Sequence, residues 1–265
     1  MSYLKNLYAN QMLIYEITKR EISERYVGQV LGVLWAVGHP LIIMAVYLFI
    51  FTVVFKQKVS GIANPPVDFG IYIISGLIPW MCFQEVLNKS CTAFTQNASL
   101  VKQIVFPIEI LPLKYVLAAF FSQVITTLIL LVYMVCSGQK ITLLLLLLLP
   151  VLWLTQIIAM LGTAYLLSSV GVFFRDLKDI VQVFSFVGMY LMPMFYLIDW
   201  MPKILRPAAY CNPFSYMLWC YHDIFYYGTF HNSFCWLVFV AGSILTLVLG
   251  LHIFFKLKHM FGDVL

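Results

Sequence analysis

Long runs of apolar residues dominate the chain and alternate with short segments that carry most of the charges. A hydrocarbon core about 30 Å thick is crossed by about 20 helical residues. Backbone groups in lipid must be hydrogen-bonded within their own segment, so such runs are helical. Six runs meet this requirement, at residues 30–55, 69–87, 112–135, 141–174, 180–198 and 232–255. The pattern predicts an all-α integral membrane protein with six transmembrane helices.

Two of these runs have features that modify a simple crossing. Residues 141–174 carry no charge and, as one helix, are too long for an upright crossing and too short for two. We expect one tilted or projecting helix there, bent at Pro150. Pro79 is expected to kink the helix over 69–87.

The segments at the two ends of the series are amphipathic or aromatic. Residues 1–29 predict a cytoplasmic helix lying in the membrane interface, with Leu4, Leu7, Tyr8, Tyr15 and Ile22 near one face. Residues 199–231 combine few charges with many aromatic residues and three prolines. This composition favours short re-entrant or interfacial helices before the last span, forming an extracytoplasmic gate.

Composition and charge agree with one membrane domain over residues 1–265. The chain is 63 % hydrophobic and 10 % charged. In the predicted topology, one side of the membrane carries Lys5, Lys19, Arg20, Arg25, Lys89, Lys102, Arg175, Lys178, Lys256 and Lys258. The other side carries only Lys56, Lys58, Lys140, Lys203 and Arg206. Positive residues concentrate in the cytoplasm, so both termini are expected there.

The sequence lacks the residue patterns that metal binding, nucleotide binding and catalysis require. The sequence has no CxxC pair, no HxxxH cluster and no GxxxxGK[ST] phosphate loop, and it shows no convergent His, Asp and Glu set. We therefore expect no metal, no catalytic residue and no bound cofactor in this chain. The ionisable residues closest to the spans, Glu85 and Glu109, fall near predicted cytoplasmic ends, which disfavours an ion-coupled transporter.

Two cytoplasmic segments are candidate docking surfaces. Residues 97–107 have a polar start, an apolar middle and a terminal proline, which suits a short helix on the membrane face. Residues 175–179 form a compact charged turn between two apolar helices. An ordinary solvated loop is the alternative for both.

Five motifs in order resemble the ABC-2 type transporter permeases that export O-antigen, capsule or teichoic-acid polysaccharides. The first is the run 25–35 (RYVGQVLGVLW) followed by Pro40. The others are GLIPW at 76–80 with Phe83, the connection from Asn97 to Pro112, the pair Arg175–Asp176 and the pair Asn212–Pro213. The resemblance covers the whole chain.

The resemblance implies a permease dimer with two separate ATP-binding cassette subunits, which would bind ATP and Mg. The substrate would be an undecaprenyl-diphosphate-linked glycan, moved across a bacterial inner membrane with no nucleic acid involved. ATPase docking would fall to Asn97, Leu100, Lys102, Phe106, Pro107, Arg175 and Asp176. A substrate gate for the diphosphate and lipid would use Arg25, Tyr26, Gly32 and Trp35, because the Arg fork pairs with phosphate oxygens.

An uncharged sugar polymer needs a path that binds weakly, which aromatic faces provide. The candidates are Tyr47, Phe51, Phe184, Tyr190 and Phe195. Packing or contact with membrane lipid is the alternative for each of them, and topological anchoring is the alternative for Arg25. A permease for drugs or small lipids is the alternative function.

Overall fold

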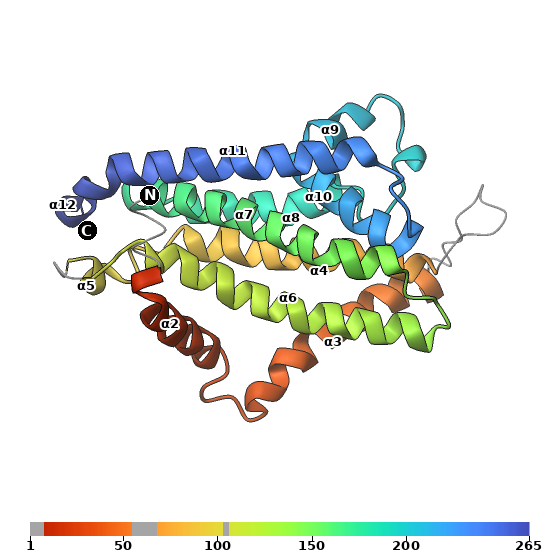
Figure 1. Ribbon diagram of the computed structural model, residues 1–265, viewed down its shortest axis with the longest axis horizontal. Coiled ribbons are helices and arrows are strands. Elements are labelled where there is room, and N and C mark those ends of the chain that lie inside the picture. The colour runs from red at the N-terminus through yellow and green to blue at the C-terminus, as the bar shows by residue number, and fades with distance from the viewer. Residues whose placement is uncertain (1–7, 55–67, 103–105, 265) are drawn as a thin grey trace.

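The computed structural model describes residues 8–54, 68–102 and 106–264, and regular structure in these parts is entirely helical. Four helices are long and apolar enough to cross a membrane. They are α4 (Phe69–Ser90), α6 (Ile110–Cys136), α7 (Leu143–Phe173) and α11 (Ser233–Leu257), the last continued by a turn to Met260. Figure 1 shows them side by side along the long axis of the molecule. A shorter apolar helix, α3 (Trp35–Leu48), and the short helix α8 (Leu177–Leu191) flank them.

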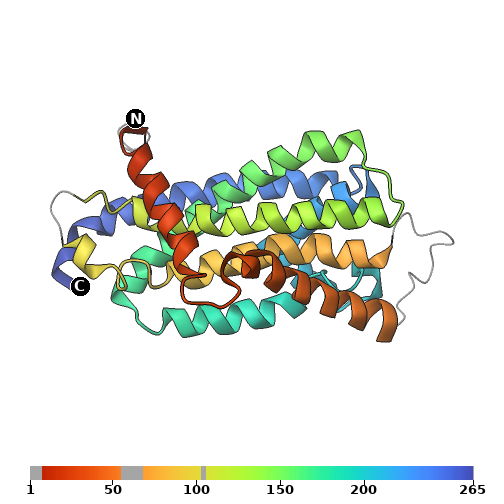
Figure 2. The same ribbon diagram turned by 90° about the horizontal axis from the view of Figure 1, so that it is seen from below.

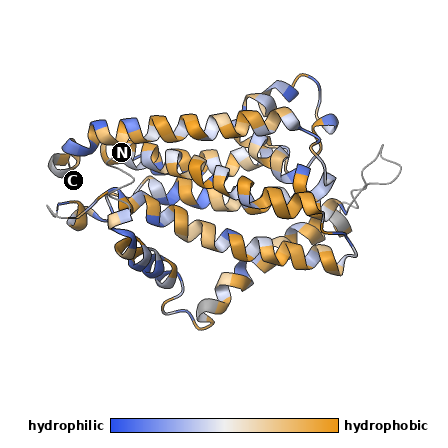
Figure 3. Ribbon diagram, in the orientation of Figure 1, coloured by the Kyte–Doolittle hydropathy of each residue, from blue (hydrophilic) through white to orange (hydrophobic). Residues whose placement is uncertain are grey.

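The short helices lie at the two ends of this bundle. In Figures 1 and 2, α5 (Ala98–Val101) and α12 (Phe261–Val264) lie at one end, and α2 (Gln11–Glu24) lies obliquely toward the same end. At the opposite end lie α9 (Arg206–Cys211), α10 (Pro213–His222) and the turn between α6 and α7. Hydrophobic residues cover the long helices, whereas α2 carries many hydrophilic ones (Figure 3).

Burial separates a central helix from peripheral ones. Within the protein, 83 % of the most apolar stretch of α4 is buried, against 22 % in α11. α4 therefore forms the centre of the bundle. The apolar outer surface of α11 has no protein partner among the described residues, as expected for a helix that faces lipid.

The close approach of α7 and α11 depends on two glycines. A Cβ atom added at Gly250 would lie 2.1 Å from the carbonyl oxygen of Gly162. No side chain fits in that space, so the two backbones meet directly at this crossing. Small residues permit such crossings in membrane proteins, where van der Waals contact drives helix association.

A second group of buried side chains forms at the end that holds α5 and α12. This end cluster consists of Phe94, Ile108, Leu111, Tyr165, Val172, Phe254 and Phe261. The Tyr165 hydroxyl donates a hydrogen bond to the Glu109 carbonyl at 2.8 Å, and the Glu109 carboxylate pairs with Lys258. These contacts fix the start of α6 against α7 and the C-terminal segment.

The expected helices form with some changes in their ends. Residues 141–174 give the single helix expected, α7, which continues through Pro150. The first predicted run starts too early, because residues 30–34 contain Gly32 at a φ of +48° and a 3-10 turn before α3 begins at Trp35. A π-helix at Phe49–Val54 continues α3, and residue 55 lies outside the described residues.

The fifth predicted run is also displaced. α8 starts at Leu177, three residues before the predicted start, and ends at Leu191 rather than at residue 198. Met192 is extended because it precedes Pro193. The segment expected to be helical over 192–197 is therefore an irregular connection to the short turn Ile198–Trp200.

Candidate functional site

A cavity of about 680 Å³ lies between the segment that joins α2 to α3 and the helices α3, α4 and α6. It extends from Arg25 and Asn88 at the α2 end to Met44 and Thr126 deeper in the bundle. Its polar lining consists of Arg25, Gln29, His39, Gln84, Glu85, Asn88, Ser122, Gln123 and Thr126. Amide side chains and hydroxyls thus outnumber the charged groups, and the rest of the lining is mostly apolar, so the cavity offers a few polar groups on an apolar surface.

Ion pairs between α2 and the helix bundle position Arg25 at this cavity. Glu21 is buried, and its two carboxylate oxygens lie 3.5 Å from Lys89 Nζ on α4 and 3.2 Å from Lys114 Nζ on α6. α2 ends at Glu24, and Arg25 is the next residue. The pairs of Glu21 therefore fix the position at which the chain enters the cavity.

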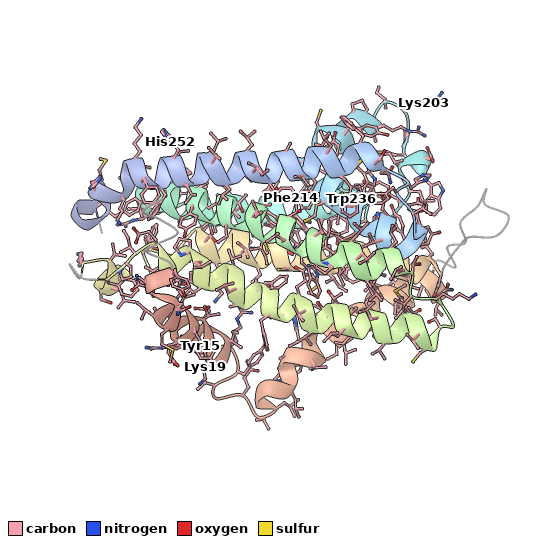
Figure 4. All side chains as sticks on the ribbon, in the orientation of Figure 1. Tyr15, Lys19, Lys203, Phe214, Trp236 and His252 are labelled. Carbon is pink, nitrogen blue, oxygen red and sulfur yellow. The ribbon has the colours of Figure 1, made fainter. Side chains whose placement is uncertain are left out.

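The opposite face of α2 is exposed. The Arg20 Nε donates a hydrogen bond to Glu24, and this bond lowers the pKa of the Glu24 carboxyl. Tyr15 is exposed, with Lys19 Nζ 5.9 Å from the centre of its ring. Figure 4 shows both residues on the side of the molecule opposite His252 of α11. This face mixes aromatic and positive groups, as interfacial helices do.

Arg25 is engaged by two side chains within the cavity. One terminal nitrogen lies 2.5 Å from a carboxylate oxygen of Glu85 on α4. The other donates a hydrogen bond of 3.3 Å to the Ser122 hydroxyl on α6. The Gln29 side chain donates to the Arg25 carbonyl at 2.9 Å. Arg25 is thus positioned by three neighbours, and Glu85 balances its charge.

Three of the four residues expected to form the substrate gate line this cavity, and the fourth does not. Arg25, Tyr26 and Trp35 line the cavity together. Gly32 does not line it, and a Cβ atom at Gly32 would meet no atom within 4 Å. Its φ of +48° instead favours glycine at the turn that leads into α3. The structure assigns Gly32 a conformational role at this turn.

A buried polar network forms the deep wall of the cavity. Gln123 lines the cavity and exchanges hydrogen bonds with Gln156 on α7. The Gln123 side chain also donates to the Tyr221 hydroxyl of α10 at 2.8 Å, and this hydroxyl donates to Gln156. Gln156 completes the network with a bond of 3.2 Å to the Pro79 carbonyl. Four helices are therefore joined at one point.

The sequence pattern assigns no site role to Glu85, Gln123 or Gln156, and it places Tyr221 only within the gate expected over residues 199–231. Glu85 had a signal, because a carboxylate within an apolar run is costly unless it is paired. The two glutamines lie within predicted spans, where a side-chain amide needs a partner. The sequence contains that requirement but does not say which helices meet.

Four of the five aromatic residues expected along the channel form one cluster. The ring of Phe195 stacks on Tyr47 at 5.2 Å and on Phe51 at 5.1 Å between ring centres. Tyr190 contacts Phe195 at 5.9 Å. This aromatic cluster joins α3 and its π-helical extension to the end of α8. Phe184 lies elsewhere and contacts Phe214 at 6.1 Å.

The segment expected to dock an ATPase is only partly exposed. Leu100 and Phe106 pack against the end cluster, whereas Ser99 and Lys102 are exposed. Asn97 donates to the Ala93 carbonyl at 2.8 Å and so fixes the turn before α5. Pro107 is described, but residues 103–105 of this segment lie outside the described residues.

The second candidate docking surface, the charged turn at residues 175–179, is exposed at the end of the bundle that holds α5. Arg175 and Asp176 form the turn between α7 and α8 and are both exposed. They therefore present a charged surface near α5.

No group of three or more His, Cys, Asp or Glu residues that could hold a metal occurs within residues 8–54, 68–102 and 106–264. The six cysteines are free, and Cys82, Cys91, Cys220 and Cys235 are buried. The cavity offers an Arg–Glu pair and amides in place of a ligand set for a metal.

Comparison with known proteins gives consistent similarities. The family model "ABC-2 type transporter" matches residues 12–226. The chain is 30 % identical over 253 residues to the O-antigen export system permease protein RfbA of Klebsiella pneumoniae, covering 96 % of this chain and 95 % of the relative. It is 30 % identical over 227 residues to RfbA of Myxococcus xanthus, covering 84 % of each.

A more distant similarity extends to a polysialic acid transport protein. The polysialic acid transport protein KpsM of Escherichia coli is 28 % identical over 203 residues, covering 76 % of this chain and 72 % of the relative.

Proposed function

The chain belongs to the ABC-2 type transporter family, and from this premise we propose that it is the membrane permease of an ATP-driven polysaccharide exporter. It moves an O-antigen-like glycan, linked to a polyprenyl diphosphate, from the cytoplasm to the outer face of the bacterial inner membrane. The names of the relatives support polysaccharide export over export of drugs or small lipids. The observation that carries the proposal is the cavity that unites Arg25, Tyr26 and Trp35 beside α2.

The cavity suits the head of such a lipid. Arg25 meets the diphosphate, because its planar fork donates two parallel hydrogen bonds to phosphate oxygens. The first sugar then lies against Trp35, whose indole ring stacks on the sugar ring. The side-chain amides of α4 and α6 form hydrogen bonds with the sugar hydroxyls. The polyprenyl chain stays in the surrounding lipid. We propose that this arrangement orients the substrate before it enters the conduit.

The conduit forms between two copies of the chain. α8 exposes Val183, Phe186 and Tyr190, and α3 exposes Leu41, Ile42 and Val46. Helices that expose apolar side chains over one face pack against lipid or another protein surface. We propose that these faces meet in a homodimer, with the aromatic cluster of Tyr47, Phe51, Tyr190 and Phe195 beside the path. We propose that Phe184, which lies outside this cluster and is exposed on α8, lines the same path.

The membrane topology follows from this assignment. α3 with its extension and α8 add two crossings to the four long helices, which gives six, and α9 and α10 are re-entrant. The whole of 1–265 is one transmembrane domain, with 1–29 at the cytoplasmic face and 199–231 as the extracytoplasmic gate. Both termini are cytoplasmic, as the distribution of Lys and Arg favours.

The energy comes from partner subunits. We propose that two ATP-binding cassette subunits bind ATP and Mg and dock against residues 97–107 and the turn at Arg175 and Asp176. The exposed charge of Lys102 lies on this surface. This chain then carries no catalytic residue and no cofactor.

The proposal is tested by removing the positive charge from the cavity. Arg25→Ala, introduced in a strain that lacks the native copy, should lower surface polysaccharide at least about tenfold, because a charge-assisted pair to phosphate is lost. Lipid-linked glycan should accumulate inside the cell, and the permease should still co-purify with its ATPase partner. Arg20→Ala is the matched control, because Arg20 is exposed and pairs only with Glu24 among the described residues. Normal surface polysaccharide in the Arg25→Ala strain contradicts the proposal.

A further inference from the structure

Two opposite charges face each other inside the cavity. The Arg25 guanidinium lies 2.5 Å from the Glu85 carboxylate, and their side chains are only 17 % and 29 % exposed. His39 is the one other titratable side chain, besides Tyr26 and Cys82, among the described residues of the lining. The cavity is therefore close to electrically neutral before any ligand enters it.

This pairing changes what Arg25 can bind. An anion that takes the guanidinium must displace Glu85 or lie beside it, and like charges at such distances repel. The Nε of Arg25 and the terminal nitrogen beside Glu85 are buried and have no hydrogen bond among the described residues, so these donors become available to a ligand when Glu85 moves away. The guanidinium is thus both occupied by a carboxylate and incompletely satisfied.

Glu85 has a second cation within reach along its own helix. Lys89 follows four residues later on α4, and a Glu placed four residues before a Lys is the favourable order for a helical ion pair. Lys89 now lies 3.5 Å from Glu21, whose other oxygen remains 3.2 Å from Lys114. Glu85 can therefore leave Arg25 for Lys89 without leaving a carboxylate unpaired.

We propose that Glu85 determines which lipid head group reaches Arg25. This inference rests on the proposed function of the cavity. When a phosphodiester takes the place of the Glu85 carboxylate at Arg25, one negative charge replaces another, so the exchange contributes little binding free energy. A diphosphate that joins a glycan to a polyprenol carries two negative charges, so it displaces Glu85 toward Lys89. Anionic phospholipids with a single net negative charge, such as phosphatidylglycerol, are excluded from Arg25, and zwitterionic phosphatidylcholine does not compete because its choline balances its phosphate.

The test compares binding in two lipid environments. The full chain is placed in nanodiscs of phosphatidylcholine, with or without excess phosphatidylglycerol, and its dissociation constant for undecaprenyl diphosphate is measured. For the unmodified protein the constant should change less than about twofold between the two lipids. For Glu85→Gln the dissociation constant in phosphatidylcholine should be lower than that of the unmodified protein. Adding phosphatidylglycerol should then raise the constant of this variant at least about fivefold, because the competing lipid now reaches Arg25.

Three further variants make the result specific. Glu85→Asp keeps the charge and should keep the insensitivity to phosphatidylglycerol. Glu24→Gln removes an exposed carboxylate next to Arg25 in the sequence and should behave as the unmodified protein. Lys89→Gln removes the second cation and should weaken binding of undecaprenyl diphosphate, although Lys89 does not line the cavity.

The outcomes separate this inference from the proposed function. If Glu85→Gln binds equally in both lipids, or more weakly in both, Glu85 does not select the head group and the inference is overturned. If Arg25→Ala binds undecaprenyl diphosphate as tightly as the unmodified protein, the proposed role of the cavity itself fails. Loss of binding in Arg25→Ala, together with an insensitive Glu85→Gln, overturns the inference alone.

Discussion

The side-chain amides of Gln123 and Gln156 exchange two hydrogen bonds, each 2.9 Å long, in the interior of the helix bundle. One glutamine lies on α6 and the other on α7, and both are almost fully buried. The pair connects the cavity to α10 through Tyr221 and to the backbone of α4 at Pro79. A fully satisfied polar network of this kind specifies how the helices pack.

The first prediction concerns this pair. Gln156→Leu should lower the free energy of unfolding by about 1 kcal/mol, because Gln123 loses its partner in a nonpolar interior. The double variant Gln123→Leu with Gln156→Leu should cost less than the sum of the single variants, since no amide is then left unpaired. Denaturant titration of the purified protein measures both. Additive losses would mean that the amides do not interact.

The second prediction concerns the attachment of α2. Glu21→Ala should destabilise the protein by about 3–5 kcal/mol, because Lys114, with a side chain only 10 % exposed, keeps a buried charge without its counter-ion. The expected readout is a lower temperature of thermal aggregation in detergent. Glu24→Ala on the same helix removes a carboxylate that is exposed and should leave this temperature nearly unchanged. Equal effects of the two substitutions would contradict the role of Glu21.

The third prediction concerns the crossing of α7 and α11. Gly250→Ala should destabilise by about 1–3 kcal/mol, because the new methyl group overlaps the Gly162 carbonyl and forces the helices apart. Gly242→Ala, on the same helix, meets no atom within 4 Å and should have no destabilising effect. The difference between the two variants, measured by denaturant titration, isolates the close approach from helix propensity. No difference would exclude direct backbone contact at this crossing.

The fourth prediction concerns the docking surface. Phe106→Asp should release the ATPase subunit, but Phe106 also packs on the end cluster and its loss would disturb folding. Lys102→Glu is the sharper test, because Lys102 is exposed and its reversed charge should repel the partner without affecting the core. Co-purification of the ATPase should fall several-fold. Lys140→Glu, exposed at the opposite end of the bundle, is the control, and equal recovery with both variants would move the docking surface elsewhere.

The fifth prediction concerns the source of energy. The purified chain should hydrolyse no ATP by itself, and hydrolysis should appear when the proposed cassette subunits are added. A phosphate-release assay measures both. Turnover by the chain alone would overturn the division of roles between permease and ATPase.

Much of the site could be anticipated from the sequence, though not its internal connections. Arg25, Tyr26 and Trp35 lie close together in the sequence, so a helix start near a membrane face brings them to one cavity. Gly32 belongs to the same motif but lies outside the cavity lining, in the turn before α3, and its role at the gate stays a prediction. The pairing of Arg25 with Glu85 could not be anticipated, because the two residues belong to helices whose contact no local pattern reveals.

The sequence by itself determined that the chain is helical, where its long apolar helices run and which segments lie at each end of the bundle. These properties are local, because each lipid-embedded segment must satisfy its own backbone hydrogen bonds and match the thickness of the bilayer. Only the tertiary structure decided that Glu85 balances Arg25, that Gln123 meets Gln156 and that Phe195 joins Tyr47 and Phe51. Such partners depend on the relative rotation and crossing of helices, which side-chain packing sets between segments far apart in the chain.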